Sequence, residues 1–432
     1  MSLLTKWYMV QCGPLDKRAQ TMQLPDKLMG ELIRFVSSHE VGHTLGLRHN
    51  MIASSATPVE KLRDKKWVEA NGHTVSIMDY ARFNYVAQPG DGIKQISPQI
   101  GPYDMMAIEW GYRWFPDEKG AAEKQQAFLK KHSGKEYRYS EAQSQRTAMD
   151  PRALSEDLGD DAMKSAGYGI ENLKRVMPNI VEWTRTGEPG QTYDEASKLY
   201  QGVIFQWSLY LYHVLANVGG MYIDNTTIDD GKQTFTFVEK DKQKRAVQFL
   251  IDEVFTCPKW LFRSELNKYT FINKNTPLGV QEQSPDYALQ NQQSYMLWDM
   301  LDNNRIMRMF ANEQANGKEA FTAVEMMDML HKHFFGKTIA GRQLTIDERQ
   351  LQKNFVDALI TAAAQQEGVK INKKICDTPA IIDSPDHNWQ CVSLSSASRT
   401  IDMGGTQTAR VSDAISVKRG ELLRILSLLK GK

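Results

Sequence analysis

The sequence has almost no net charge and no long apolar run. Its 432 residues include 53 Lys and Arg against 52 Asp and Glu, which leaves a formal net charge of +1 at pH 7. A balance this even provides no basic surface for nucleic acid or for an anionic membrane. No stretch approaches the roughly 18 consecutive apolar residues of a transmembrane helix. We therefore expect no nucleic-acid partner and no transmembrane segment.

Cysteine is scarce as well. The four cysteines are Cys12, Cys257, Cys376 and Cys391, and none of them forms a CxxC pair. This spacing argues against a second, cysteine-ligated zinc site. Cys376 and Cys391 lie close together in a loop-like segment. They either form a disulfide, if the protein is exported, or remain two free thiols.

Histidine is also rare, yet three of the nine histidines fall within the stretch 39-HEVGHTLGLRH-49. Residues 25–47 predict a helix, because proline and aspartate stand at the start and apolar residues recur at helical spacing. His39 and His43 are four residues apart, so they lie on the same face of that helix. Two imidazoles in this arrangement can reach one metal ion.

The residues that follow extend this pattern into a metal site. Gly46 can adopt a positive φ that ends the helix, so the chain can turn back and bring His49 to the same point. Three imidazoles and one open position are typical of a catalytic Zn²⁺ site, with one ion per chain. Glu40 points away from the ligand face by about a hundred degrees. It is therefore placed to take a proton from a water that the metal activates. The alternative is a surface helix with three solvent-facing histidines.

The complete pattern, HExxHxxGxxH, resembles the zinc signature of the metzincin metalloproteases. Metzincins carry a second mark, a methionine in a tight turn beneath the metal, and Met78 in 76-SIMDY-80 matches it. The resemblance implies that Met78 packs under the imidazoles as a flexible apolar floor. It also implies that Tyr80 helps to stabilise the oxyanion, as a tyrosine at this position does in some metzincins. The alternative is a tyrosine that only packs in the turn.

Further segments look like a bacterial family of large, secreted zinc-dependent metalloproteases of metzincin type. These segments are 27–51, 76–93, 101–114, 205–222 and 242–262, so the resemblance covers most of the chain. It implies a zinc-dependent metalloendopeptidase that acts on peptide or protein substrates outside the cytoplasm, in the periplasm or the extracellular space. Two other interpretations stay open: a binding or scaffold module stabilised by zinc, and a zinc hydrolase that acts on a non-peptide bond.

The beginning of the chain lacks two features that this resemblance leads one to expect. The first ten residues, MSLLTKWYMV, have no signal-peptide pattern. Metzincins also place a twisted sheet before the zinc helix, whereas only 38 residues precede His39. These residues leave room for one strand, such as 6–12. We therefore expect a fragment of a longer exported precursor that lacks most of its N-terminal sheet.

The expected fold is mainly α. We predict a metzincin-like catalytic core over residues 1–114 and a mostly helical domain over 115–432, with a small β-hairpin within 221–238. Helical periodicity occurs at 119–132, 160–186, 193–218, 241–255, 284–315, 318–335, 345–367 and 412–430. The acidic run 150–161 either binds Ca²⁺ or begins a solvated helix capped by Asp160 and Asp161, and its spacing favours the helix start.

Overall fold

The computed structural model confirms a mainly α protein. It describes residues 3–116, 119–141, 146–270 and 285–364, and near the C-terminus residues 417, 418, 420–425 and 427. The pair Cys376 and Cys391 lies outside the described residues, as does much of the helix predicted at 412–430. The chain divides into two compact units, Met1–Ala216 and Asn217–Lys432. The boundary predicted after residue 114 concerns where the catalytic core ends, and it stays a prediction.

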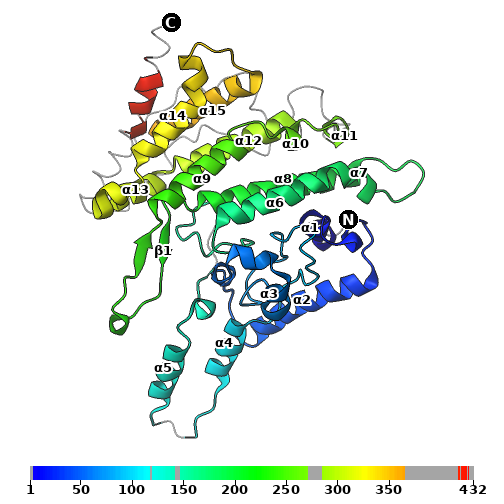
Figure 1. Ribbon diagram of the computed structural model, residues 1–432, viewed down its shortest axis with the longest axis vertical. Helices are drawn as coiled ribbons and strands as arrows, with labels where there is room; N and C mark the ends of the chain where they lie inside the picture. Colours follow the sequence, from blue (N-terminus) through cyan, green and yellow to red (C-terminus); the bar gives the residue numbers. More distant parts are fainter. Residues whose placement is uncertain are drawn as a thin grey trace. The chain divides into compact units, whose positions relative to one another are not determined.

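The first unit consists of helices joined by irregular segments (Figure 1). Its helices are α1 (Leu3–Cys12), α2 (Asp26–Thr44), α3 (Lys65–Asn71), α4 (Pro102–Tyr112), α5 (Ala121–Lys131), α6 (Ala162–Val176), α7 (Ile180–Trp183) and α8 (Asp194–Leu215). Among the residues described in this unit, none lies in a β-strand. This agrees with the expectation of a core whose sheet is reduced.

The strand expected at 6–12 is wrong, because these residues belong to helix α1. Residues 8–12 are all buried, and α1 packs against both α6 and α8. A helix covered on several sides shows no clear apolar period, and its aromatic and β-branched residues then read as a strand. Tertiary packing thus decides the conformation of this segment.

Helices α6 and α8 form the largest packed pair of the first unit. Gly169 in α6 allows their close approach, since a Cβ atom there would lie 2.5 Å from the ring of Tyr210. His213, at the end of α8, is buried and bonds through Nε2 to the carbonyl of Ser155 at 3.0 Å. It is therefore a core histidine with a backbone partner.

The acidic run 150–161 is more deeply buried than a solvated helix start would be. Asp161 does cap α6, where its carboxylate accepts from the backbone N–H groups of Met163 and Lys164. However, Asp150 and Asp157 are only 1% and 5% exposed. The expectation of a solvated run is therefore wrong for these residues. Both are buried within the first unit, where Asp150 forms an ion pair with Arg152 and Asp157 accepts from Ser54 Oγ. No group of three metal ligands forms in this run among the described residues.

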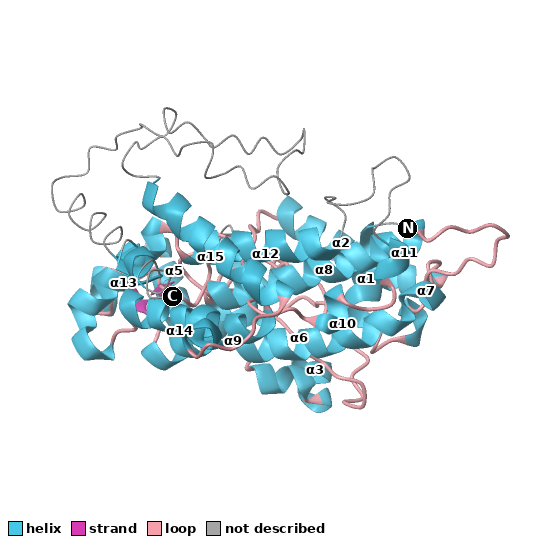
Figure 2. Ribbon diagram, turned by 90° about the horizontal axis from the view of Figure 1, so that it is seen from above, coloured by secondary structure: helices cyan, strands magenta, loops and turns pink. Residues whose placement is uncertain are grey.

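The second unit begins with the predicted hairpin. Strands β1 (Met221–Ile223) and β2 (Phe235–Phe237) pair antiparallel, with Met221 opposite Phe237. The helices that follow are α9 (Lys240–Glu253), α10 (Lys259–Phe262), α11 (Asn267–Thr270), α12 (Pro285–Met300), α13 (Asn303–Asn316), α14 (Ala323–Ile339) and α15 (Ile346–Ala364). Helices predominate over strands throughout the described chain (Figure 2).

A buried arginine anchors the start of this unit. Arg305 of α13 donates hydrogen bonds to the carbonyl oxygens of Asp299 and Val218, and Arg308 donates to the carbonyl of Gly219. Burial lowers the pKa of Arg305 to about 10, so the side chain stays charged at neutral pH. These bonds hold the residues before β1 against α13.

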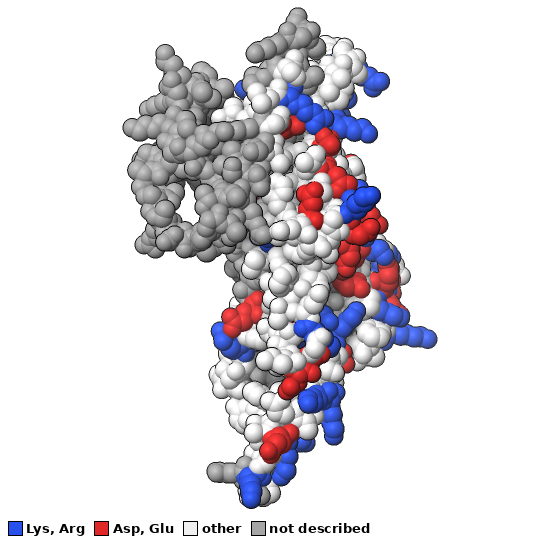
Figure 3. Space-filling model, turned by 90° about the vertical axis from the view of Figure 1, so that its left-hand side faces the viewer, with Lys and Arg blue, Asp and Glu red and all other residues white. Residues whose placement is uncertain are grey.

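The surface agrees with the even charge balance of the sequence. Basic and acidic side chains are intermingled over the face drawn in Figure 3. Among the described residues, no helix is both long and apolar enough to cross a membrane.

Candidate metal centre

Helix α2 carries two of the three histidines and ends where the sequence predicts. Gly46 has a φ of +82°, and the N–H of Gly46 bonds to the carbonyl of His43 at 3.0 Å. The N–H of Leu47 bonds to the carbonyl of Gly42, also at 3.0 Å. These two bonds form the Schellman motif that commonly closes a helix at a glycine. The chain then reverses direction and returns His49 toward the helix.

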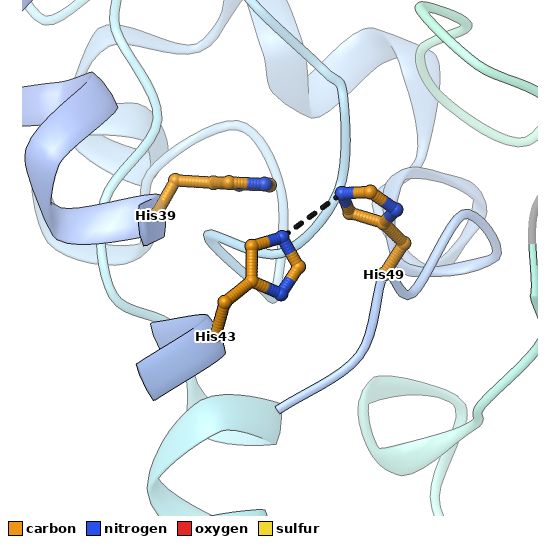
Figure 4. Close-up of side chains that lie close together, drawn as sticks. All are labelled: His39, His43 and His49. Carbon is orange, nitrogen blue, oxygen red and sulfur yellow. Dashed lines mark hydrogen bonds between the residues drawn. The ribbon is translucent and has the colours of Figure 1, made fainter. Parts of the chain in front are cut away.

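The three imidazoles converge on one point (Figure 4). One possible ligand atom from each of His39, His43 and His49 lies within 4.8 Å of the other two, and the Nε2 atoms of His43 and His49 are 3.1 Å apart. A tetrahedral Zn²⁺ ion with bonds of about 2.0–2.1 Å would hold its nitrogens roughly 3.3 Å apart. The closest pair therefore matches zinc geometry, and His39 is near enough to complete the set.

Backbone carbonyls determine which nitrogen of two rings is available to a metal. The Nδ1 atom of His39 lies 2.7 Å from the carbonyl of Ile77, and the Nδ1 atom of His43 lies 2.9 Å from the carbonyl of Leu47. A carbonyl oxygen only accepts, so both Nδ1 atoms carry the proton. The lone pair of each neutral ring is therefore on Nε2, the form that binds a metal.

The surroundings of His49 favour its neutral form. Burial lowers its pKa, and the proximity of His39 and His43 lowers it further, because protonated imidazoles this close would repel one another. The negative charge of Glu40 acts in the opposite direction on the same ring. Glu40 is solvent-exposed on α2, so its carboxylate is open to water. The donor set, three imidazole nitrogens, fits a Zn²⁺ ion.

Met78 lies directly against the helix that carries the ligands. It is fully buried, and a Cβ atom added to Gly42 would lie 2.4 Å from its sulfur. The glycine between the two helical histidines thus provides the space that Met78 fills. The N–H of Asn50, next to His49, bonds to the carbonyl of Met78 at 3.1 Å. The methionine turn therefore contacts both sides of the metal centre.

Tyr80 lies beside two of the histidines. Its ring centroid is 4.5 Å from that of His49 and 5.5 Å from that of His39. The guanidinium of Arg82 lies 5.9 Å from the centroid of the Tyr80 ring and 3.4 Å from that of Trp7. The half-buried Tyr80 ring also packs against Met51, Ile52 and Ala153. The packing role and the role at the metal are thus both compatible with its position.

Asp104, in the first turn of α4, contacts the turn that carries Met78 and was not among the site residues predicted from the sequence. Its buried carboxylate accepts hydrogen bonds from Ser76 Oγ at 2.6 Å, from the N–H of Ile77 at 2.8 Å and from the N–H of Gly101 at 2.8 Å. Burial raises its pKa, and these hydrogen bonds oppose that rise. The sequence signal was Gly-Pro-x-Asp, a pattern that favours a capped helix start.

The match to a protein family agrees with this geometry. A family model described as Met-zincin matches residues 21–341, which is most of the chain. The chain belongs to the Met-zincin family. No curated protein and no solved structure matches it. Membership of the Met-zincins implies a function of the zinc metalloprotease type, and the matched range includes α2, the methionine turn and α4.

Beside Met78, this Met-zincin buries an acid. Asp79 accepts hydrogen bonds from the N–H of Ser54 at 2.6 Å and from Thr74 Oγ1 at 3.3 Å. Burial raises its pKa to about 8. Asp157, which accepts from Ser54 Oγ at 3.2 Å, has its pKa raised by burial and by the charge of Asp79. The two buried acids thus contact the same serine next to the methionine turn.

Asp79→Asn should stabilise the protein increasingly as the pH rises from 5 to 8. The folded pKa of Asp79 is about 8 and the unfolded value is about 3.9, so over this window the folded state holds a proton that the unfolded state has released. Stability is therefore lost as the pH rises, by up to about 1.4 kcal/mol per pH unit, whereas asparagine stays neutral. Urea unfolding of both proteins at pH 5 and pH 8 measures the difference.

The control for this prediction is Asp64→Asn. Hydrogen bonds from the backbone of Trp67 and from Lys61 lower the pKa of Asp64, so it is ionised in both states at pH 5–8. Its substitution should therefore change stability equally at both pH values. The same pH-independent result for Asp79→Asn would contradict the assignment of a protonated Asp79.

Proposed function

We propose that this Met-zincin is a zinc-dependent metalloendopeptidase that hydrolyses peptide bonds in peptide or protein substrates. The observation that carries the proposal is the convergence of three imidazoles, two of which bond to backbone carbonyls through Nδ1 and so keep Nε2 free for a metal. A site of three protein ligands keeps one coordination position open for water or substrate. The resemblance to secreted metalloproteases supports action in the periplasm or outside the cell.

His39, His43 and His49 would hold one Zn²⁺ ion per chain. When bound there, the ion acts as a Lewis acid on the scissile carbonyl and makes a water molecule acidic enough to react at neutral pH. Glu40 accepts the proton of the attacking water and then donates it to the leaving amine. Its exposed position on α2, beside the ligands, leaves the carboxylate open to the substrate.

Tyr80 donates a hydrogen bond to the oxygen that gains negative charge during the attack. A donor that is already in place costs no rearrangement at the moment of reaction. The ring is held by its contacts with His49 and by packing against Met51, Ile52 and Ala153. Met78 fixes the floor of the site through its contact with Gly42.

The donor count disfavours a zinc-stabilised scaffold. A structural zinc site is closed by four protein ligands, whereas the described residues bring together three. A scaffold also has no chemical use for an acid at Glu40. A hydrolase for non-peptide bonds would use the same residues, so substrate screening separates it from the peptidase.

Glu40→Gln should abolish peptide hydrolysis while leaving zinc binding intact. The amide cannot accept the proton of water, and loss of a general base typically costs about 10²–10⁴-fold in rate. Cleavage of an internally quenched fluorescent peptide library measures activity, and metal analysis measures the zinc content.

Glu31→Gln, on the same helix but ion-paired with Arg18, is the matched control and should retain activity. Full activity of Glu40→Gln would remove Glu40 from the mechanism. Zinc binding by the unaltered protein without cleavage of any peptide in the library would contradict the peptidase proposal itself.

Tyr80→Phe should lower kcat with little change in KM or zinc content. Removal of one oxyanion donor typically costs about 10²–10³-fold in kcat, and phenylalanine preserves the packing of the ring. The control is Tyr112→Phe. The Tyr112 hydroxyl donates to the carbonyl of Leu45 at 3.1 Å, at the end of helix α2, which carries His39 and His43. A kcat for Tyr80→Phe equal to that of the Tyr112 control would show that Tyr80 only packs in the turn.

A further inference from the structure

We propose that Asp104 is a positioning residue for the metal ligand His39 and that it acts through the backbone of the methionine turn. This inference rests on the proposed function, since it concerns the same metal centre. Asp104 lies outside the histidine motif, in the first turn of α4, and its side chain is only 3% exposed. It touches no metal ligand directly in any of its three hydrogen bonds.

The carboxylate holds the two peptide groups on either side of Ile77. Oδ2 accepts from the N–H of Ile77 at 2.8 Å, which fixes the peptide group before this residue. Oδ1 accepts from Ser76 Oγ at 2.6 Å, and the same hydroxyl accepts from the N–H of Met78 at 3.0 Å. That second contact fixes the peptide group after Ile77, because its N–H belongs to Met78 and its carbonyl to Ile77.

The carbonyl of this second peptide group is the one that orients His39. Its oxygen lies 2.7 Å from His39 Nδ1, so it sets the tautomer and the rotation of the ring. The chain of contacts therefore runs from Asp104 through Ser76 and the peptide group between Ile77 and Met78 to His39. A rotation of this peptide group would turn the carbonyl away and release the ring.

The start of α4 packs closely against the residues that precede Met78. A Cβ atom added to Gly101 would lie 2.0 Å from the carbonyl oxygen of Val75, so glycine is required where α4 meets the turn. The N–H of Tyr103 also bonds to that carbonyl at 3.1 Å. The start of α4 is thus seated against residues 75–77, and its third residue meets the turn directly.

Two simpler roles make different predictions. Asp104 also bonds to the N–H of Gly101, so it caps α4, and a role in capping alone would affect stability without changing the metal centre. Alternatively, the negative charge of Asp104 acts on His39 through space. A hydrogen-bond relay needs the acceptor atom at Ile77 and not the charge. Asparagine and alanine at this position therefore separate the three roles.

The test measures metal affinity and geometry in the full chain. Zn²⁺ affinity is obtained by competition with a chromophoric chelator, and Co²⁺ loaded into the metal-free protein reports four-coordinate geometry through its visible absorption. Asp104→Ala removes the relay and should weaken Zn²⁺ binding by about 10–100-fold, the usual effect of losing an outer partner of a metal ligand. The Co²⁺ absorption bands should shift or weaken as well.

Asp104→Asn should stay within about threefold of the unaltered affinity and keep its Co²⁺ spectrum. Its amide oxygen can accept from Ile77 and Gly101, while its NH₂ group donates to the second lone pair of Ser76 Oγ, beside the one that accepts from Met78. The matched control is Asp161→Ala, because Asp161 caps α6 through two backbone N–H groups. This variant should lose thermal stability but retain metal affinity and spectrum.

Unaltered affinity and spectrum in Asp104→Ala would overturn the proposal in favour of capping. Equal losses in Asp104→Asn and Asp104→Ala would overturn it in favour of charge. If Asp104→Ala does not fold, Asp104→Ser, whose hydroxyl is too short to bridge both peptide groups, should show the same loss, and wild-type affinity in that variant would overturn the proposal. Metal binding without peptide cleavage would defeat the proposed function alone, whereas failure of the unaltered chain to bind metal would overturn both.

Discussion

The hydrogen bond between His39 Nδ1 and the carbonyl of Ile77 joins helix α2 to the turn that carries Met78, and the proposed metal centre depends on this junction. On one side of it, Met78 fills the space above Gly42 in α2. On the other side, Asp104 ties the turn to α4. Helix α2, the turn that carries Met78 and the start of α4 are thus held together around the His39 ring. The Nε2 atom of this ring can then bind a metal without further rearrangement.

Local spacing made most of the centre predictable. Residues four apart on a helix must share a face, so the proximity of His39 and His43 follows from helix geometry alone. Gly46 predicted the reversal that returns His49, and the structure shows the corresponding Schellman motif. The mainly α class and the hairpin at 221–238 were likewise visible as periodicity and turn residues.

The features that the sequence did not reveal arise from contacts between distant segments. Residues 6–12 form a helix because α6 and α8 cover them, although their composition favours a strand. Asp157 is buried because Ser54, far away in the sequence, provides a partner. The role of Asp104 was likewise not visible, because the residues next to it in the sequence do not show that Ile77 lies within hydrogen-bond distance. Such partners depend on packing, which the spacing of residues in one segment does not encode.

The most direct test of this account is the zinc content per chain of protein purified without added metal, beside a His43→Ala variant. The account predicts close to one zinc in the unaltered chain and none in the variant, because two imidazoles leave the ion with too few protein ligands. An unaltered chain that takes up no zinc even when the metal is offered would contradict the account. It would show that the three imidazoles converge without forming a metal site.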